Sequence, residues 1–352
     1  MKILSPFSRV KEVLPLVKAG ADELYCGIVP AEWKEKFGMF DTLNRREGCR
    51  ANFSCFDDLR EAIRLSHGAG VPVFVVMNGL YTEKQYPLVM KIIEELKHIK
   101  ADGLIISDIG LLPVLSKGGV FAQVHMGTGG VTFNSRAALF YAKAGVTRVV
   151  LDRLLTIKEI AGIARKVSSE GELEVFIMNT RCPNIDGLCT FYHGLSFDAA
   201  DIAAETGGKD KKTRFYSSYD PGYGGHGCEL DFSARVLNGS GERLVKEPPF
   251  QRKKIAPGAG PRKSCGACAI YDFAVMNISC LKIVERGMPL LEKVADTGFV
   301  RGALRILSDN PGIGRQEFIR KVRRLYCVTY KYSACSGFSC YYPSVFNTAG
   351  GG

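Results

Sequence analysis

The chain has 352 residues, a formal net charge of +11, and 46% hydrophobic and 24% charged residues, so it is long enough to bury a large core. The longest nearly uninterrupted apolar run, around residues 71–80, is too short to cross a bilayer, which argues against a membrane protein. Arg9 and Lys11 interrupt the N-terminal segment before an apolar signal-peptide core could form, so a cytoplasmic protein is expected.

Eight short apolar runs rich in strand-forming residues predict eight β-strands, and segments with helical periodicity separate them. Several helical segments end on a glycine, such as Gly20 or Gly145, which is the usual left-handed stop after a helix. The expected strands cover residues 2–6, 23–28, 72–78, 103–108, 121–126, 148–152, 172–179 and 279–285, and the clearest helices cover 57–67, 82–99, 134–144 and 156–167.

The regular alternation of strands and helices predicts a parallel sheet, because each helix returns the chain to the same edge of the sheet. Eight such units within the first 285 residues favour an α/β fold of the TIM-like (β/α)8 barrel type. An open doubly wound sheet is the alternative, since periodicity does not reveal whether the sheet closes.

One stretch, residues 182–267, breaks this pattern with many Gly, Pro, Tyr and Lys residues and little helical period. It follows the seventh strand, so in a barrel it would lie over the carboxyl ends of the strands, where barrel enzymes carry their active sites. The expected division is residues 1–181 for the first seven strands, 182–267 for a Cys-rich insertion over the barrel mouth, 268–320 for the end of the barrel, and 321–352 for a Cys-rich tail.

Twelve cysteines in a chain expected to be cytoplasmic need an explanation other than disulfides, because the cytosol keeps thiols reduced. Eight of them lie after residue 181 in polar, glycine-rich segments and are candidate metal ligands. The remaining four lie in or beside expected strands, where buried cysteine packs as a small hydrophobic residue: Cys26, Cys49, Cys55 and Cys280.

Cys182 and Cys189 form a C-x6-C pair directly after the seventh strand, and Cys228 and the CGAC pair of Cys265 and Cys268 follow. Converging thiolates suit zinc or an iron–sulfur cluster. Structural zinc sites usually begin with closely spaced cysteine pairs, so the wider C-x6-C spacing favours iron–sulfur, with zinc or no metal as alternatives.

The tail adds three more cysteines, in the segment CVTYKYSACSGFSC. With the spare cysteine of the CGAC pair they suffice for a second cluster, and a partly buried tail without metal is the alternative. The expected ligands of this second cluster are Cys265, Cys327, Cys335 and Cys340.

Several polar residues stand at or just beyond the carboxyl ends of the expected strands and would ring the barrel mouth. Asp108 could act as a general acid or base, or cap the following helix. His125 could move a proton or be a satisfied core residue, and Arg153 could bind a substrate anion or a structural carboxylate. Asn78 completes the candidates for catalysis, and Thr128 is a candidate for substrate binding.

Basic residues gather in segments 209–214 and 315–324, and around 252–254 with Arg262 and Lys263. Such clusters raise the local concentration of a phosphate-bearing partner. An anionic substrate such as RNA is therefore expected, and a solvated basic surface is the alternative.

The order and spacing of eight motifs resemble the collagenase-like peptidase U32 family over about residues 1–290. The motifs are AGADELYCG (19–27), ANFSCFDDLREAI (51–63), VFVVMNGLY (73–81), DGLIISDIGLL (102–112), VHMGTGGVTFNSRAA (124–138), GVTRVVLDRLLTIKEIAGIA (145–164), LEVFIMNTRCPNIDGLC (173–189) and LKIVERG (281–287).

This resemblance implies a barrel that holds a [4Fe-4S] cluster and takes part in oxygen-independent hydroxylation of RNA bases or ubiquinone precursors. It also implies that Lys282 and Arg286 contact substrate. Family members sometimes act as heterodimers, so a homo- or heterodimer is one expectation. Cys265 is the alternative to Cys268 as the fourth ligand. The four ligands that the resemblance implies are Cys182, Cys189, Cys228 and Cys268.

Three motifs depart from the family pattern and indicate a divergent subgroup. Met178 and Asn179 replace a His-Gly pair, Leu154 replaces a Glu, and LKIVER replaces LKIEGR. These departures concern the substrate and the reaction more than the fold. Two other functions stay open: a peptidase, although the sequence has no GxSxG or HExxH motif, and an RNA-binding module with a structural metal.

Overall fold

The structure is a computed structural model whose described residues fall into two compact units. The larger unit combines Met1–Thr190 with Lys263–Gly352, and the smaller one spans Phe191–Arg262. In the smaller unit, β8 (Ser233–Ala234) and β9 (Phe250–Gln251) form an antiparallel pair. The described residues are 1–37, 43–46, 50–118, 121–167, 169–179, 185–188, 233–234, 250–251, 263–331, 335 and 340–347.

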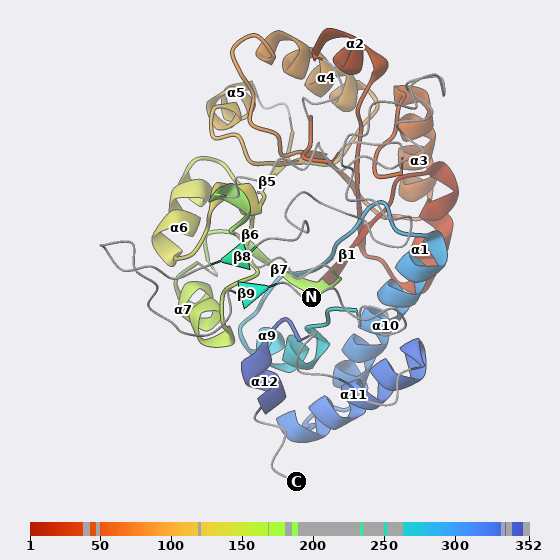
Figure 1. Ribbon diagram of the computed structural model, residues 1–352, viewed down its shortest axis with the longest axis vertical. Helices are drawn as coiled ribbons and strands as arrows, with labels where there is room; N and C mark the ends of the chain where they lie inside the picture. The colour runs from red at the N-terminus through yellow and green to blue at the C-terminus, as the bar shows by residue number, and fades with distance from the viewer. Residues whose placement is uncertain are drawn as a thin grey trace. The chain divides into compact units, whose positions relative to one another are not determined.

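The larger unit is built on a closed barrel of eight parallel strands (Figure 1). The strand order around it is β1-β10-β7-β6-β5-β4-β3-β2, so β10 closes the sheet by pairing with both β1 and β7. This confirms the TIM-like (β/α)8 barrel and excludes the open sheet. The strands are β1 (Lys2–Pro6), β2 (Glu23–Gly27), β3 (Val73–Met77), β4 (Gly103–Ile106), β5 (Gln123–Met126), β6 (Arg148–Val150), β7 (Glu172–Met178) and β10 (Cys280–Ile283).

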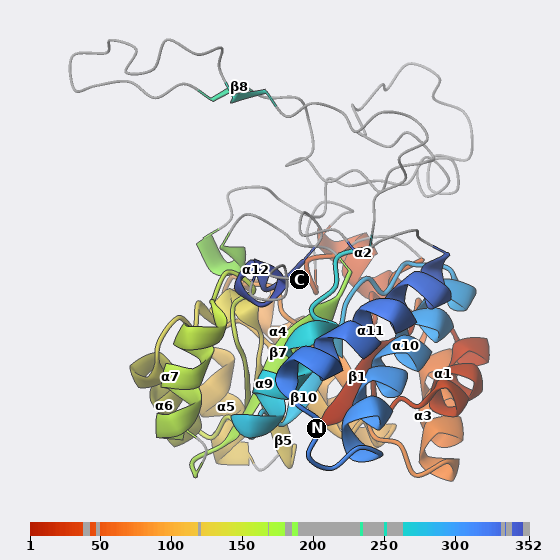
Figure 2. The ribbon, with the colours of Figure 1, turned by 90° about the horizontal axis from the view of Figure 1, so that it is seen from below.

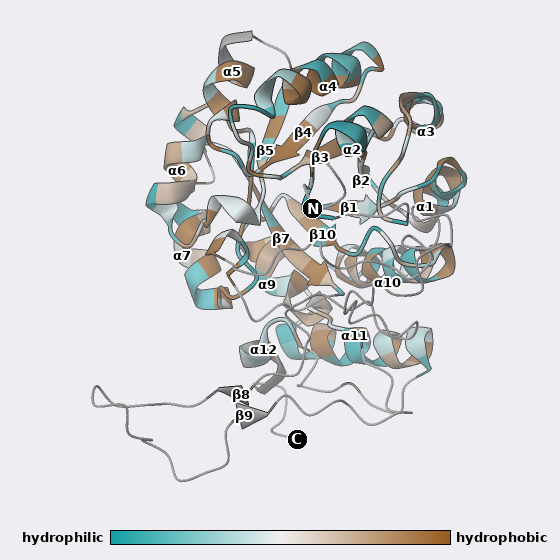
Figure 3. Ribbon diagram, turned by 45° about the horizontal axis from the view of Figure 1, so that its top comes forward, coloured by the Kyte–Doolittle hydropathy of each residue, from teal (hydrophilic) through white to brown (hydrophobic). Residues whose placement is uncertain are grey.

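Helices surround the barrel, and their apolar faces pack against it (Figure 3). The expected glycine stops are present, with φ of 105° at Gly20 after α1 and 92° at Gly145 after α6. Asn134 caps α6 by accepting a hydrogen bond from the Ala137 N–H at 3.0 Å. The helices are α1 (Val13–Ala19), α2 (Ala31–Phe37), α3 (Phe56–Gly68), α4 (Tyr86–His98), α5 (Leu111–Gly118), α6 (Ser135–Lys143), α7 (Ile157–Val167), α9 (Ile270–Val275), α10 (Leu290–Ser308), α11 (Arg315–Tyr330) and α12 (Pro343–Asn347).

The helix after the last strand, α10, completes the outer ring of the barrel, and α11 and α12 follow it. α10 packs on α1 and β1, and α11 lies beside α10 (Figure 2). The domain boundary expected between residues 320 and 321 falls inside α11, because the basic segment 315–324 is part of that helix. None of the described helices combines the length and apolarity needed to span a membrane.

The larger core lies between the strands and the helices, as expected for a barrel with an outer helical ring. A second, smaller apolar cluster fills part of the barrel interior, and charged residues fill the rest. The interior cluster consists of Leu4, Tyr25, Phe74, Val76, Ile105 and Cys280.

The segment that returns from the insertion is fixed against the end of β7. Cys265 forms an antiparallel bridge with Met178, and the Gly266 N–H donates to the carbonyl of Ile177 at 2.8 Å. The chain therefore re-enters the barrel unit beside the strand from which it left.

Candidate functional site

The candidate site lies at the barrel mouth, defined here as the residues that follow the carboxyl ends of the strands. Barrel enzymes build their sites from these loops. In this chain the described mouth residues come from the loops after six strands, β2, β3, β4, β5, β6 and β10, and from the turn η3 (Asp186–Leu188) that follows β7.

Asp186 is the anchor of the mouth. Its carboxylate oxygen Oδ2 accepts hydrogen bonds from Thr128 Oγ1 at 2.5 Å and from Arg153 Nη2 at 2.7 Å. Its backbone carbonyl accepts a third bond from Arg45 Nη1 at 2.8 Å. Because Asp186 stands between Cys182 and Cys189 in the sequence, these bonds fix the centre of the C-x6-C segment to the loops after β2, β5 and β6.

The electrostatics of Asp186 follow from these contacts. Burial by itself would raise the pKa of this carboxyl group, but Arg153, the Thr128 hydroxyl and Arg45 together lower it. The Arg153 guanidinium also stacks over the ring of Phe176, with its central carbon 4.4 Å from the ring centroid. Arg153 is thus held from two sides. Its carboxylate partner, Asp186, belongs to the chain itself, which was the alternative to a substrate anion.

A second arginine group lies on the β2 side of the mouth. Arg286 donates to Asn44 Oδ1 at 3.0 Å and to Asn52 Oδ1 at 3.3 Å. Its guanidinium crosses directly over Gly27, where a Cβ atom would lie only 1.7 Å from Nη1, so a residue without a side chain is needed there. Arg46 lies nearby, and burial lowers its pKa.

The arginines of the mouth share their surroundings. The charges of Glu285, Arg153 and Asp186 all act on Arg46, and those of Arg286, Arg46 and Glu285 all act on the Tyr25 hydroxyl. Four guanidinium groups, from Arg45, Arg46, Arg153 and Arg286, therefore stand with the carboxylates of Asp152, Asp186 and Glu285 in one polar region.

Four polar oxygens at the mouth have no hydrogen-bond partner among the described residues. They are Asn78 Oδ1 after β3, Ser107 Oγ after β4, Thr132 Oγ1 after β5 and Asp152 Oδ2 after β6. A buried polar atom without a partner costs free energy, so such atoms mark where a substrate group or water would bind. Burial raises the pKa of Asp152 above its usual range.

The expected mouth residues differ in where the structure places them. Asn78, Thr128, Arg153 and Arg286 lie at the mouth. Asp108 follows β4, but both its oxygens are occupied, by the N–H groups of Tyr81 at 2.9 Å and Gly110 at 2.8 Å and by the Tyr86 hydroxyl at 3.2 Å. This is the cap-like arrangement. Burial first, and then the charge of Asp108 and the hydrogen bond to it, raise the pKa of Tyr86 to about 12.

Two of the expected residues lie inside the barrel instead of at its mouth. His125 is fully buried within β5, and its ring packs on Phe74 with 4.4 Å between centroids. Lys282 points into the interior from β10 and binds Glu174 Oε1 at 2.7 Å. The expectation that His125 and Lys282 lie at the mouth was wrong. Side chains alternate between the two faces of a strand, and only the closure of the barrel decides which face points inward.

The structure describes only some of the cysteines that the sequence predicts as metal ligands. Cys182, Cys189 and Cys228 lie outside the described residues, as does Cys49. Cys26 and Cys280 are buried as expected, whereas Cys55 is exposed because it is the residue before the first turn of α3. No group of three or more His, Cys, Asp or Glu side chains in the described part is arranged to hold a single metal ion.

Sequence reasoning missed several mouth residues, namely Asn44, Arg45, Arg46, Ser107, Asp152 and Asp186. Arg45 and Arg46 follow a segment without periodicity, so no pattern singled them out. Asp186 could have been found, because it is the acidic residue at the centre of the C-x6-C pair.

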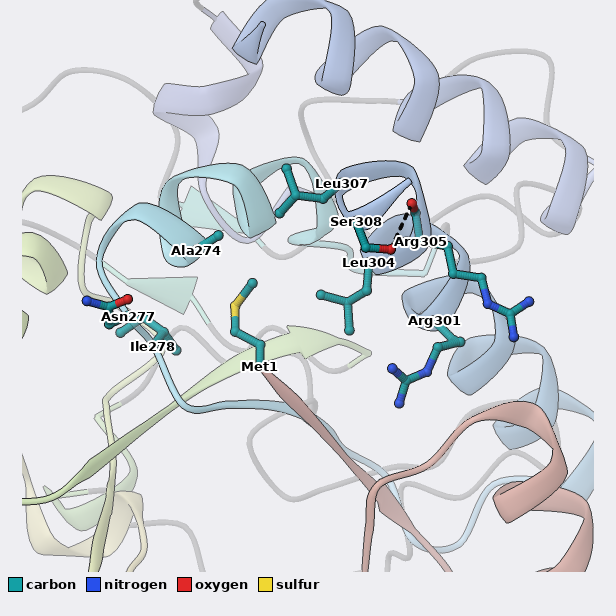
Figure 4. A pocket seen from close by; sticks show the side chains of 9 residues that line it. All are labelled: Met1, Ala274, Asn277, Ile278, Arg301, Leu304, Arg305, Leu307 and Ser308. Carbon is teal, nitrogen blue, oxygen red and sulfur yellow. Dashed lines mark hydrogen bonds between the residues drawn. The ribbon is translucent and has the colours of Figure 1, made fainter. Parts of the chain in front are cut away.

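A separate pocket of about 560 Å3 lies at the opposite, amino-terminal end of the barrel (Figure 4). It is lined by Met1, by Asn277 and Ile278 ahead of β10, and by the last turns of α10. It is remote from the polar region of the mouth and shares no residue with it.

These features define a class of protein: a (β/α)8 barrel whose arginine-rich mouth is joined to a C-x6-C segment. The chain matches Peptidase family U32 over residues 8–340 and belongs to this family.

Among curated relatives, an uncharacterized protease of Methanocaldococcus jannaschii is 30% identical, over 54% of this chain and 43% of its own length. The tRNA hydroxylation protein P of Haemophilus influenzae is 27% identical, over 53% of this chain and 38% of its own length. A collagenase of Porphyromonas gingivalis is 23% identical, over 53% and 44%. The chain spans less than half the length of each of these relatives.

Proposed function

We propose that this chain is an iron–sulfur-dependent enzyme that modifies an anionic substrate, with RNA bases as the substrate class. The observation that carries this proposal is the arginine group held against the C-x6-C segment at the barrel mouth. Arg45 and Arg153 both bind Asp186, which stands between Cys182 and Cys189 in the sequence. Guanidinium groups recognise phosphate through paired hydrogen bonds.

The proposed cysteine ligands are Cys182, Cys189 and Cys228. Soft thiolates in loops are the donor set that iron–sulfur clusters use. The anchored turn at Asp186 supports this assignment, because this residue of the C-x6-C segment is bound to the arginines of the mouth. When bound, the cluster would supply electron transfer.

The chain's own residues have separable roles in this proposal. Arg46 and Arg286 would bind a phosphate of the substrate. Asn78 and Ser107 would hydrogen-bond the substrate through the oxygens that have no partner in the described part of the chain. Asp152, whose pKa is raised by burial, would keep a proton more readily than a solvated carboxylate.

The reaction itself is proposed from the relatives. A relative named for tRNA hydroxylation covers about half of this chain, which supports hydroxylation of an RNA base. Two other relatives are named a protease and a collagenase. None of the described histidines lies at the mouth, since His67 and His98 lie on α3 and α4 and His125 lies inside the barrel, so a cysteine–histidine pair there finds no support in the described residues.

The test compares total RNA from cells that carry or lack the gene, with nucleosides identified by mass spectrometry. Loss of a nucleoside one oxygen atom heavier than its parent is expected, with restoration by wild type but not by Cys182→Ala/Cys189→Ala. Arg46→Gln should lower its level about tenfold or more, because a charge-assisted hydrogen bond is worth about 1.5–3 kcal/mol.

Two matched controls should behave as wild type. Cys55→Ala removes an exposed thiol, and Arg60→Gln removes an exposed arginine paired only with Asp57 on α3. An unchanged set of nucleosides, together with peptide cleavage that survives Cys182→Ala/Cys189→Ala, would establish a peptidase instead.

A further inference from the structure

Two segments far apart in the sequence bring cysteines together beside β7. The backbone of Cys265 lies between Met178 at the end of β7 and Cys340, forming an isolated bridge with each. The Tyr341 N–H donates to the carbonyl of Cys265 at 3.0 Å. The CGAC pair and the tail thus meet through backbone contacts, which fix Cys265 and Cys340 next to each other.

The CGAC pair forms a tight turn in which a backbone N–H contacts the Cys265 thiol. Cys268 lies in the 3-10 turn η6 (Ala267–Ala269) that leads into α9, and the Ala267 N–H donates to Cys265 Sγ at 3.4 Å. Tyr342 covers Gly266, where a Cβ atom would come within 2.7 Å of the ring. Backbone N–H groups that donate to cysteine sulfur are one of the means by which proteins hold and tune iron–sulfur clusters.

Four thiols interact electrostatically at this place. Cys265 interacts with Cys268, Cys335 and Cys340, and Cys268 interacts with the same two tail cysteines. Cys340 is buried, and Cys265, Cys268 and Cys335 are partly buried. Four cysteines from two distant segments of the chain are therefore close to one another.

Helix α11 places positive charge beside these thiols. Arg323 hydrogen-bonds the Cys268 side chain. The charge of Arg315 also interacts with Cys268, and this guanidinium is held by Asp272 at 2.8 Å. Such arginines would offset the negative charge of a thiolate-bound cluster.

We propose that Cys265, Cys268, Cys335 and Cys340 hold a second iron–sulfur cluster. A cluster fits better than one zinc ion, because each thiolate of a cluster binds a different iron, whereas a single ion needs all its ligands close to one point. The described thiols are not arranged around a single point. Cys268 then belongs to this site, and the first cluster keeps Cys182, Cys189 and Cys228 as its cysteine ligands.

This inference replaces one ligand expected from the sequence. Cys327 was expected in the second cluster, but it lies within α11, and the interactions of Cys265 and Cys268 are with each other and with Cys335 and Cys340. Cys327 is therefore the matched control: a tail cysteine that is close in sequence but outside the group.

The test measures iron and acid-labile sulfide per chain in anaerobically purified full-length protein. Wild type and Cys327→Ala should each hold about eight irons, and Cys335→Ala/Cys340→Ala and Cys182→Ala/Cys189→Ala about four each. Wild-type iron in Cys335→Ala/Cys340→Ala overturns the second cluster. If the protein holds about one zinc ion per chain in place of the tail iron, the second site is a zinc site and the proposed iron–sulfur cluster is wrong.

A second set of variants tests Cys268 and separates this inference from the proposed function. Adding Cys268→Ala to Cys182→Ala/Cys189→Ala should remove the remaining iron, and retention of that iron shows that Cys268 is not a ligand of the tail site. If Cys182→Ala/Cys189→Ala alone keeps all its iron, the ligands of the proposed function are wrong while the tail result stands. Urea unfolding of every variant identifies any that lose iron only because they fail to fold.

Discussion

Single residues at the mouth are fixed by several partners at once. Arg153 binds Asp186 at 2.7 Å and covers the Phe176 ring, while Thr128 binds the same carboxylate oxygen of Asp186. A side chain held from two directions loses little further freedom when a ligand arrives. Arg153 is therefore a positioning residue for the C-x6-C segment, and its planar guanidinium suits that task better than a lysine would.

His125 is the residue whose expected role changes most. Inside the barrel it is surrounded by Phe74, Gln123 and the cations Arg148 and Lys282. Burial and these positive charges lower its pKa well below the usual value, so it stays neutral in the folded protein. A histidine that cannot be protonated there does not suit a proton shuttle at neutral pH.

This placement predicts a pH-dependent stability. The unfolded chain protonates His125 near pH 6.5, whereas the folded protein does not, so the stabilisation is complete above that pH and is lost as the pH falls below it. Between about pH 7.5 and about pH 5.5, the free energy of unfolding of wild type, measured with urea, should fall by about 1.4 kcal/mol more than that of His125→Gln. An identical pH dependence of the two proteins would contradict the neutral, buried state.

At the scale of elements, the turn η3 (Asp186–Leu188) is packed on the turn η2 (Thr128–Gly130). A Cβ atom at Gly187 would lie 2.2 Å from Val131 Cγ2 and 2.5 Å from the Gly129 carbonyl oxygen. Since the second contact is with backbone, no side-chain movement relieves it. The two turns can approach only because position 187 has no side chain.

Gly187→Ala should therefore displace the C-x6-C segment without unfolding the barrel. We expect the thermal midpoint to fall only slightly and the iron content to fall toward the value of Cys182→Ala/Cys189→Ala. The control is Gly162→Ala on α7, where an added Cβ meets no atom within 4 Å. That control should keep its iron and gain about 0.5–1 kcal/mol of stability from the better helix former. Full iron in Gly187→Ala would show that the turn does not position the ligands.

For the whole molecule, the charges inside the barrel link strands on opposite sides of it. Arg148 on β6 binds Glu23 on β2 through both terminal nitrogens, at 2.5 and 2.9 Å. It also binds Glu172 and Glu174 on β7. Because β2 and β6 are opposite in the strand order, this arginine fills the interior where other barrels use apolar side chains.

Arg148→Met tests how much the barrel depends on this network. Removing the arginine leaves the buried Glu23 carboxylate without its main partner and takes a second partner from Glu174, so the free energy of unfolding should fall by about 3–5 kcal/mol. Arg60→Met, which breaks an exposed pair with Asp57, should cost at most about 1 kcal/mol. Equal effects in urea unfolding would mean that the interior pairs contribute no more than surface ones.

The tertiary structure also decides where the chain after the insertion attaches. The buried Asp296 on α10 accepts hydrogen bonds from Asn179 after β7 at 2.9 Å, from Lys263 at 2.9 Å and from Tyr330 on α11 at 2.7 Å. Lys263 was counted in a basic cluster expected either to attract an anionic partner or to be a solvated surface, but here it forms a partly buried ion pair. One carboxylate thus joins β7, α10, α11 and the end of the insertion.

The sequence by itself determined the strands, the helices and the family. Strand ranges such as 2–6 and 172–179 agree with β1 and β7 within a residue, because apolar runs between glycine stops are local signals. The mouth position of Arg153 also followed, since it comes directly after a strand.

Only the tertiary structure decided which side chains face the interior and which segments meet. His125 and Lys282 point inward because the sheet closes, and closure is set by pairing between β1 and β10, which are far apart in the chain. The same is true of Asp186 beside Arg45 and of Cys265 beside Cys340. Periodicity and spacing report on neighbours along the chain, whereas these contacts depend on long-range packing that no local pattern encodes.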